Sequence, residues 1–431
     1  MSRTQDLLAR RKTIVPHGVS AFVESSVESA HGAVITDTDG RELLDFGGGI
    51  GVLNAGHTPE PVVRAIQEQA EKFIHTCFHV TTYEVYLELC EKLAELFSHG
   101  ERTKVMLTNT GAESVENAIK IARQSTARQG VICFTDAFHG RSMMAMTLTS
   151  KVDYKLGCGP FAPEVYRLQF PNFYRYGNGM SEEQFVQQEL QRLRESTHNV
   201  VDPKNVAAVI IELVQGEGGF NVAPKGYIEG LRTFCDEHGI VLIFDEVQTG
   251  FCRTGKWGAQ HHYDVTPDIT LLAKSIAAGM PLGAVVGKAD IMDSAKPGTI
   301  GGTYLGNPVS CAAALATIQF MDDNNLNTRA AEISEYIFSR LRDMQQKFPV
   351  IGDVRGLGAM QAMELIKNGD PLQPDSETCS NLAKACLERG LLLVTAGTHK
   401  NVIRFLPPLV ISDEQLAWGM GTIEELVVGS A

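Results

Sequence analysis

Two neighbouring stretches give the clearest structural signal in the sequence: IVLIFDEVQTGFCRTGKWGA at 240–259 and PDITLLAKSIAAGMPLGAVVG at 267–287. Each contains a short apolar run that ends at a polar residue, Asp245 in the first stretch and Lys274 in the second. Short apolar runs of this kind, bounded by polar and glycine-rich segments, are typical of strands that are buried on both faces. Both stretches are therefore predicted to contain a central strand of a sheet.

The regions around these stretches alternate between strand and helix patterns. The periodicity predicts strands at 104–107, 131–134, 206–214, 241–244 and 269–273, and helices at 83–97, 114–123, 181–195, 227–238, 308–321 and 330–348. This alternation predicts an α/β fold in which a parallel or mostly parallel sheet lies between layers of helices.

Length and composition limit the class of protein. The chain has 431 residues with 44% hydrophobic and 21% charged residues, which is enough apolar material for a large core and argues against disorder. The formal net charge is 38 − 51 = −13, which argues against a nucleic-acid-binding protein. The change of pattern near residue 310 predicts a large domain at 61–310. Segments 1–60 and 311–431 are predicted to form a smaller α/β domain.

The sequence also indicates a compartment. The basic segment 1–12 is not followed by an apolar run, and no apolar stretch approaches the ~18 residues of a spanning helix, so we expect neither a secretory signal nor a membrane segment. Nine cysteines without CxxC spacing suit a reduced cytoplasmic protein. The histidines and cysteine at 75–79 and the pair at 261–262 lack a second ligand group at metal spacing, so no metal site is expected.

Three predicted strands end in an ionisable residue: Glu212 in AVIIELVQGEGG (208–219), Asp245 and Lys274. Any one of them alone could be an ordinary strand-end residue that reaches solvent. Together they would meet at the edge where the strands of a parallel sheet end and where ligands bind. A partly desolvated lysine can form a Schiff base with pyridoxal phosphate, and an aspartate keeps the pyridine nitrogen of that cofactor protonated.

Two further motifs could complete such a site. In TNTGAESVENAIKIAR (108–123), Thr110, Gly111 and Ala112 lead into a helix amino terminus, which favours an anion such as a phosphate, although a helix cap alone would explain the pattern. In FTDAFHGRS (134–142), Phe138 or His139 could stack on a flat ring. Arg141 in the same motif could bind a carboxylate, or it could be an ordinary exposed arginine.

The motifs together resemble the class III (subgroup II, fold-type I) pyridoxal-phosphate aminotransferases, and within them most closely the 4-aminobutyrate aminotransferases. The resemblance extends from LDFGGGIGVLNAGH (44–57) to VIRFLPPLVIS (402–412) and includes EGGF (217–220) and GGTYLGNP (301–308) in the expected order. It implies a sheet of the seven-stranded type in the large domain. It also implies a homodimer with shared active sites, and two such dimers could pair into a tetramer. The implied reaction moves the amino group of an ω-amino acid, 4-aminobutyrate or 5-aminovalerate, to 2-oxoglutarate and yields a semialdehyde and L-glutamate.

The resemblance implies specific roles around the cofactor. Lys274 would form the Schiff base and then move the proton between the substrate Cα and the cofactor C4′, while Asp245 would pair with the pyridine nitrogen. Val247 and Phe138 would lie on the two faces of the cofactor ring, and Gln248 would approach its phenolic oxygen. Gly111 and Ala112 would bind the phosphate, and Thr303 would reach the phosphate of the other subunit.

The resemblance also implies a substrate pocket with two arginines and a gate. Arg141 would bind the distal carboxylate, Arg404 the α-carboxylate of glutamate, and Ile50 would line the pocket. Glu212 would pair with Arg404 when no α-carboxylate is present. Arg404 lies inside the apolar run VIRF, where an arginine is rarely buried without an anionic partner, so the residues themselves favour such a pairing.

Three positions depart from the family pattern, and two other functions are compatible with parts of the sequence. Leu305 occupies a place where glycine or alanine is expected, Ala278 a place where glycine is usual, and Gly283 a place where serine is common. A racemase or epimerase of the same fold would use the same lysine without a keto acid. A catalytically silent cofactor-binding or scaffold protein is the alternative from a different class, although a suitable residue fills each expected polar role.

Overall fold

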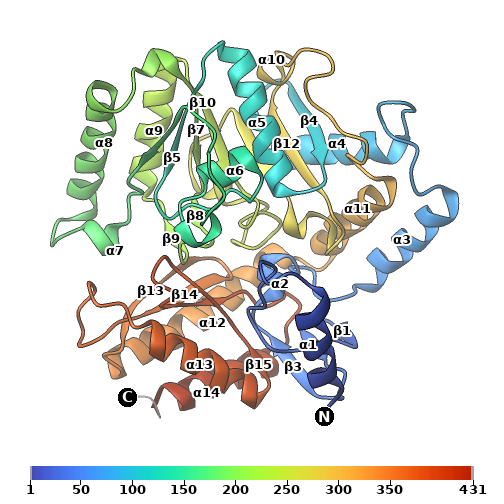
Figure 1. Cartoon of the computed structure of the whole chain (residues 1–431), viewed down its shortest axis with the longest axis vertical. Coiled ribbons are helices and arrows are strands. Elements are labelled where there is room, and N and C mark those ends of the chain that lie inside the picture. The colour runs from blue at the N-terminus through green and yellow to red at the C-terminus, as the bar shows by residue number, and fades with distance from the viewer. Residues whose placement is uncertain (1, 429–431) are drawn as a thin grey trace.

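The computed structural model describes residues 2–428. Its fold centres on a seven-stranded sheet, which lies in the upper half of Figure 1. The strand order is β4 (Thr103–Thr108), β12 (Gly283–Lys288), β11 (Ile269–Leu272), β10 (Val241–Asp245), β7 (Val206–Ile211), β5 (Gly130–Phe134) and β6 (Val165–Leu168). β12 runs antiparallel to both of its neighbours, whereas the other adjacent pairs are parallel. The prediction of a mostly parallel sheet is confirmed.

Strand β10 shows how the sheet is stabilised on both faces. Leu242 and Phe244 pack in one cluster with residues of α8 (Glu182–Asn199) and α9 (Lys225–His238). Val241 and Ile243 point to the opposite face and pack with residues of α5 (Gly111–Thr126). Because successive strand residues alternate between faces, the continuous apolar runs seen in the sequence are those of strands covered by helices on both sides.

The N-terminal and C-terminal segments both lie in the lower half of Figure 1. The C-terminal part contains an antiparallel sheet ordered β13 (Ile351–Leu357), β14 (Met360–Leu365), β17 (Val402–Phe405) and β16 (Val394–Ala396). The N-terminal strands β1 (Ser29–His31), β2 (Val34–Thr36) and β3 (Glu42–Asp45) form another sheet, whose last member is β15 (Leu391–Leu392) from the C-terminal part. This pairing supports the proposed grouping of 1–60 with 311–431, which stays a prediction.

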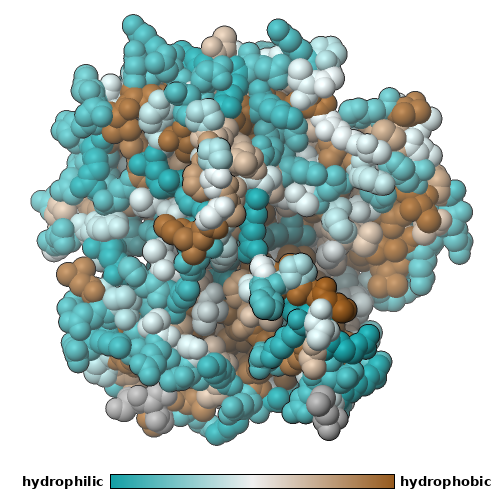
Figure 2. Space-filling view, viewed as in Figure 1, coloured by the Kyte–Doolittle hydropathy of each residue, from teal (hydrophilic) through white to brown (hydrophobic). Residues whose placement is uncertain are grey.

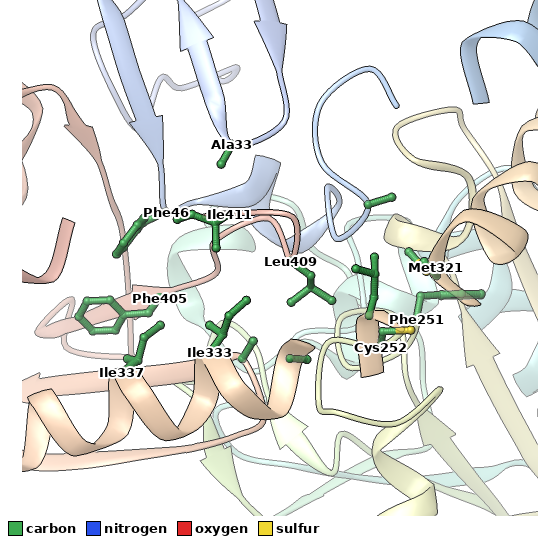
Figure 3. Close-up of a cluster of buried hydrophobic side chains, with 14 of the residues drawn as sticks. Ala33, Phe46, Phe251, Cys252, Met321, Ile333, Ile337, Phe405, Leu409 and Ile411 are labelled. Carbon is green, nitrogen blue, oxygen red and sulfur yellow. The ribbon is translucent and has the colours of Figure 1, made fainter. Parts of the chain in front are cut away.

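The core is continuous between these parts. Figure 3 shows Ala33 and Phe46 of the N-terminal segment near Ile411 and Phe405, which belong to the same buried cluster. Helices α12 (Leu326–Lys347), α13 (Ser376–Arg389) and α14 (Asp413–Val428) contribute to this cluster. Helix α11 (Pro308–Asp323), which spans the expected domain boundary, packs against α3 (Glu60–Lys72) and α4 (Glu84–Leu96).

One predicted strand is shorter than expected. The apolar run 206–214 forms β7 only as far as Ile211, and Val214 begins a separate short strand, β8 (Val214–Gln215), which pairs with β9 (Asn221–Val222). The chain leaves the sheet at Glu212, whose carboxylate accepts hydrogen bonds from backbone N–H groups of the following turn and of a neighbouring loop. A buried polar group of this kind ends a strand that the apolar pattern alone would continue.

The remaining helices are short or peripheral: α1 (Arg3–Ile14), α2 (Gly48–Gly51), α6 (Met143–Leu148), α7 (Phe173–Tyr176), α10 (Ala289–Met292) and the 3₁₀ turns η1 (Val152–Tyr154), η2 (Pro203–Asn205), η3 (Ala259–His262) and η4 (Lys274–Ala277). Within residues 2–428, no helix combines the length and the apolar character needed to cross a bilayer. The surface in Figure 2 is mostly hydrophilic with separate hydrophobic patches, and it is hollowed near the centre between the upper and lower parts.

Candidate active site

A cavity of about 380 Å³ lies at the carboxyl ends of the central strands. Its walls include residues from the ends of β7, β10 and β11, from the start of α5, and from the loop after β5. The predicted site residues among them are Thr110, Gly111, Ala112, Phe138, His139, Glu212, Asp245, Val247, Gln248 and Lys274. The fold therefore brings together most of the predicted site residues, which are spread over more than 150 positions of the sequence.

Lys274 follows strand β11, which ends two residues earlier at Leu272, and it opens the short turn η4. Its φ of 49° lies in the left-handed region, which is uncommon for a residue with a side chain and concentrates at functional sites. The neighbouring Ser275 hydroxyl donates to the Gly51 carbonyl at 3.0 Å and helps to hold the turn. Burial lowers the pKa of Lys274 in spite of the nearby Glu217 carboxylate, so the amine loses its proton more readily than an exposed lysine.

Asp245 ends strand β10 and is held in place by two hydrogen bonds. Its Oδ2 lies 2.7 Å from Nδ1 of His139, and its Oδ1 accepts from the Val247 N–H at 3.0 Å. The His139 side chain is fully buried, and its Nε2 has no partner among the described residues. His139, considered in the sequence as a stacking residue, is thus positioned as the hydrogen-bond partner of Asp245.

The amino terminus of α5 forms another wall of the cavity. Thr110 caps the helix, because its hydroxyl accepts from the Glu113 N–H at 3.2 Å. The first N–H groups of a helix have no partner within it, so those at Gly111 and Ala112 are suited to bind an anion. A Cβ at position 111 would lie 2.9 Å from Cγ1 of Val247, so glycine allows the helix to approach the loop after β10.

Val247, Phe138 and Gln248 complete the part of the cavity that suits a flat ring. Val247 and Phe138 both line it, and each is half-buried. The Oε1 atom of Gln248 is buried and has no hydrogen-bond partner among residues 2–428. An unpaired buried acceptor is costly, so its presence beside a cavity indicates that a ligand atom pairs with it.

The predicted pairing of Glu212 with Arg404 is wrong. Glu212 accepts hydrogen bonds from the Phe138 N–H at 2.9 Å and from the Gly216 N–H at 3.0 Å, and burial raises the pKa of its carboxyl. Arg404 does have an anionic partner, but this partner is Glu217, whose Oε1 accepts from Nη1 at 2.6 Å. Glu217 lies in the turn between β8 and β9, and this turn brings it to β17, where Arg404 is 1% exposed.

Electrostatics agree with this assignment. Burial by itself would raise the pKa of Glu217, but the Arg404 guanidinium and its hydrogen bond outweigh burial and lower that pKa to about 2. The same carboxylate accepts from the Tyr154 hydroxyl at 2.9 Å. Tyr154 did not emerge from the sequence, because nothing in the segment KVDYKLG (151–157) indicates that its tyrosine reaches a residue 63 positions away.

Four predicted site residues lie outside the cavity wall formed by the described chain. Arg141 is exposed and lies over the Tyr154 ring, with 4.7 Å between Cζ and the ring centroid. Arg404 lies behind Glu217. Ile50 is half-buried with a φ of 65°, and its neighbour Val52 lines the cavity instead. Thr303 is exposed in the loop that precedes α11, so its role toward another subunit stays a prediction.

Local geometry accounts for one of the departures from the family pattern. Ala278, which follows η4, has a φ of 47°, a conformation that glycine adopts without strain and alanine does not, and nothing in the structure explains the alanine. At Gly283, a Cβ would lie 2.5 Å from Oγ1 of Thr108 and 2.8 Å from Oγ of Ser114, which leaves no room for serine. Leu305 is buried and is not among the residues that line the cavity.

The sequence matches the family described as Aminotransferase class-III over residues 14–427. The chain belongs to the class-III aminotransferases. A cavity with a desolvated lysine at its wall suits the chemistry on an amino group that aminotransferases perform.

Individual relatives are similar to this chain over nearly its whole length. The sequence is 47% identical to a probable 4-aminobutyrate aminotransferase of Bacillus subtilis, over 96% of this chain and 95% of that protein. It is 45% identical to the 5-aminovalerate aminotransferase DavT of Pseudomonas putida, over 99% of each. The fold is similar to that of an amine transaminase from an uncultivated Pseudomonas species, solved in a PLP-bound form, with a TM-score of 0.90, 29% identity and 97% coverage of both chains.

Proposed function

We propose that this aminotransferase binds pyridoxal phosphate and moves the amino group of an ω-amino acid, 4-aminobutyrate or 5-aminovalerate, to 2-oxoglutarate. The products are the corresponding semialdehyde and L-glutamate. The observation that supports this function best is the buried pair of Arg404 and Glu217 beside the lysine cavity, with a second arginine, Arg141, nearby. A guanidinium that is masked by a movable carboxylate suits an enzyme whose two substrates differ by one carboxylate.

The residues around the cavity fit the cofactor. Asp245 offers a carboxylate for a ring nitrogen, the start of α5 offers N–H groups for a phosphate, and the unpaired Oε1 of Gln248 offers an acceptor for a ring hydroxyl. Val247 and Phe138 provide apolar surface for the two faces of the ring. When bound, pyridoxal phosphate supplies an electron sink that stabilises negative charge on the amino-bearing carbon of the substrate.

Lys274 performs the proton transfers of this proposal. Because burial lowers the pKa of its amine, Nζ loses its proton more readily than the amine of an exposed lysine. The unprotonated Nζ takes the proton from the amino-bearing carbon of the donor, and in the second half-reaction Nζ gives a proton to the carbon of 2-oxoglutarate that receives the amino group. His139 orients Asp245 through the 2.7 Å contact.

The two arginines divide the work of substrate recognition. An ω-amino donor carries one carboxylate, at the end far from its amino group, and Arg141 binds it. Glu217 meanwhile neutralises Arg404, since an unpaired buried guanidinium would be strongly unfavourable. Glutamate or 2-oxoglutarate brings an α-carboxylate that replaces Glu217 on Arg404.

The assembly and the compartment are part of the same proposal. We expect a homodimer in which Thr303 of each subunit reaches the phosphate site of the other, either alone or as a pair of dimers. The exposure of the loop that contains Thr303 suits such a contact. We place the enzyme in the cytoplasm, where its nine free cysteines suit a reducing environment.

A screen of single half-reactions tests the function. Amino donors of increasing chain length, from 3-aminopropionate to 6-aminohexanoate, are added to the loaded enzyme without a keto acid while the cofactor absorbance is followed. We expect the fastest conversion with the four- or five-carbon donor and full recovery of the starting spectrum with 2-oxoglutarate. Conversion of one enantiomer of an amino acid into the other without any keto acid would instead support a racemase.

A further inference from the structure

Tyr154 connects the two arginines of the proposed substrate pocket. Its hydroxyl donates to Oε2 of Glu217 at 2.9 Å, while Arg404 donates to Oε1 of the same carboxylate at 2.6 Å. On its other side, the guanidinium of Arg141 lies over the tyrosine ring at 4.7 Å from the centroid. One side chain thus contacts the gate carboxylate through its hydroxyl and the distal carboxylate-binding arginine through its ring.

The backbone around Tyr154 is held independently of these contacts. Lys151 donates to the Gly397 carbonyl at 3.2 Å, and Asp153 pairs with Lys400 at 2.8 Å. Both partners lie in the turn between β16 and β17, and the Gly397 N–H donates in turn to the Glu217 carbonyl at 3.0 Å. The turn η1 and the gate segment are therefore attached to the same hairpin, which fixes the distance between Tyr154 and Glu217.

The protonation state of the tyrosine suits a permanent donor. Burial, with a contribution from the Glu217 carboxylate, raises the pKa of Tyr154 to about 12. The hydroxyl consequently keeps its proton throughout the pH range in which an enzyme of this kind works. Tyr154 can only donate to Glu217, and the hydrogen bond favours the charged carboxylate that masks Arg404.

We propose that Tyr154 determines the specificity of this enzyme, by holding Glu217 on Arg404 and by supporting Arg141 with its ring. An α-carboxylate must displace Glu217 from Arg404, and the tyrosine hydroxyl makes that displacement less favourable. A substrate with one distal carboxylate leaves the gate closed and gains from the supported Arg141. The side chain thus sets the ratio of affinities for ligands with one and with two carboxylates, an inference that rests on the proposed two-arginine pocket.

Equilibrium binding of two unreactive acids to the loaded enzyme tests this. Valerate carries one carboxylate and glutarate carries two, and neither has an amino group to react. For Tyr154→Phe we expect titration calorimetry to give a dissociation constant for glutarate about three- to tenfold lower than in the parent, because Glu217 loses one of its two donors. The dissociation constant for valerate stays unchanged, because the ring under Arg141 remains.

A second variant separates the ring from the hydroxyl. In Tyr154→Leu the cation–π contact is lost as well, so the dissociation constant for valerate should rise about two- to fivefold. Tyr166→Phe is the matched control, since it also removes a tyrosine–glutamate hydrogen bond, to Glu164 at 2.7 Å, outside the residues that line the cavity. We expect both acids to bind this control as they bind the parent.

Arg404→Gln distinguishes failure of the inference from failure of the proposed pocket. If this variant binds glutarate as the parent does, Arg404 does not bind the second carboxylate and the proposed function itself is wrong. If it binds glutarate more weakly than the parent does while Tyr154→Phe binds glutarate as weakly as the parent or more weakly, the pocket stands and the role of Tyr154 is refuted. The inference is supported by weaker glutarate binding in Arg404→Gln together with tighter binding in Tyr154→Phe.

Discussion

The cofactor side of the cavity and the carboxylate gate are built in different ways. On the cofactor side, Asp245 and Lys274 come within 30 positions of each other, and each lies at the end of one of two adjacent buried strands. The gate combines Arg141, Glu217 and Arg404, which come from a loop after β5, the turn between β8 and β9 and a strand of the C-terminal sheet. The comparison shows that sheet register places the first group, whereas contacts between loops and separate sheets place the second.

The single wrong pairing follows from this difference. Glu212 and Glu217 are five positions apart, both face the interior, and either could in principle meet an arginine. Glu212 lies at the strand end, where nearby N–H groups already satisfy its carboxylate. Only the turn between β8 and β9 brings Glu217 to Arg404, and a turn of that kind leaves little trace in the periodicity of a sequence.

The largest expected effect tests the cofactor side. Lys274→Ala removes the proton-transferring amine, so turnover should fall by about ten-thousand-fold, and the absorbance band of the lysine-bound cofactor should disappear. Stopped assays and absorption spectra measure the two losses, with Lys256→Ala, a change at an exposed position, as the control. A variant that kept both the band and the activity would remove Lys274 from the mechanism.

Asp245→Asn should be the next most severe change. The neutral amide cannot hold a protonated ring nitrogen, so we expect turnover to fall by about a hundred- to thousandfold for every amino donor alike. Steady-state kinetics with 4-aminobutyrate and with glutamate measure this, and Asp264→Asn at an exposed position is the control. A loss restricted to one of the two donors would mean that Asp245 acts on the substrate side and that the two regions are not separate.

The gate should contribute to stability in a pH-dependent way. Because the pKa of Glu217 is lowered in the folded protein to about 2, the stabilisation is complete above its ordinary value of about 4.5 and is lost as the pH falls toward 2. Denaturant titrations should show Glu217→Gln less stable than the parent by about 3 kcal/mol at pH 7, with the gap closing at acidic pH. A gap that is the same at pH 7 and pH 3 would contradict the charged pair.

The two glutamates should differ in their effect on specificity. Glu217→Gln leaves Arg404 unmasked, so KM for 4-aminobutyrate should rise about tenfold while KM for glutamate changes less. Glu212→Gln keeps the Arg404–Glu217 pair and should not alter the ratio of the two KM values. The reverse result would restore the pairing that the sequence suggested.

The smallest expected effect concerns the turn that follows the lysine. Ala278→Gly relieves the left-handed backbone at φ 47° and should raise the free energy of unfolding by about 1 kcal/mol. Ala277→Gly, one position earlier in the same turn, is the matched control and should lower it by about 0.5–1 kcal/mol. Chemical denaturation measures both, and equal effects of the two changes would show that backbone strain at 278 is unimportant.

The sequence by itself determined the α/β architecture, the class of chemistry and the residues at the strand ends. Buried strands produce continuous apolar runs, and the polar residue that ends such a run must reach the edge of the sheet, as Asp245 and Lys274 do. The helix start at Thr110 could also be predicted, because the signal for a helix cap lies within a few neighbouring residues.

Only the tertiary structure decided which carboxylate masks Arg404 and which side chain joins the two arginines. Glu217 and Tyr154 reach their partners across 187 and 63 positions of sequence, through a turn and a hairpin whose course depends on the packing of the whole chain. A charged pair between a turn and a strand of another sheet has no periodicity, and the low-dielectric interior that makes it strong exists only once the sheets have packed together.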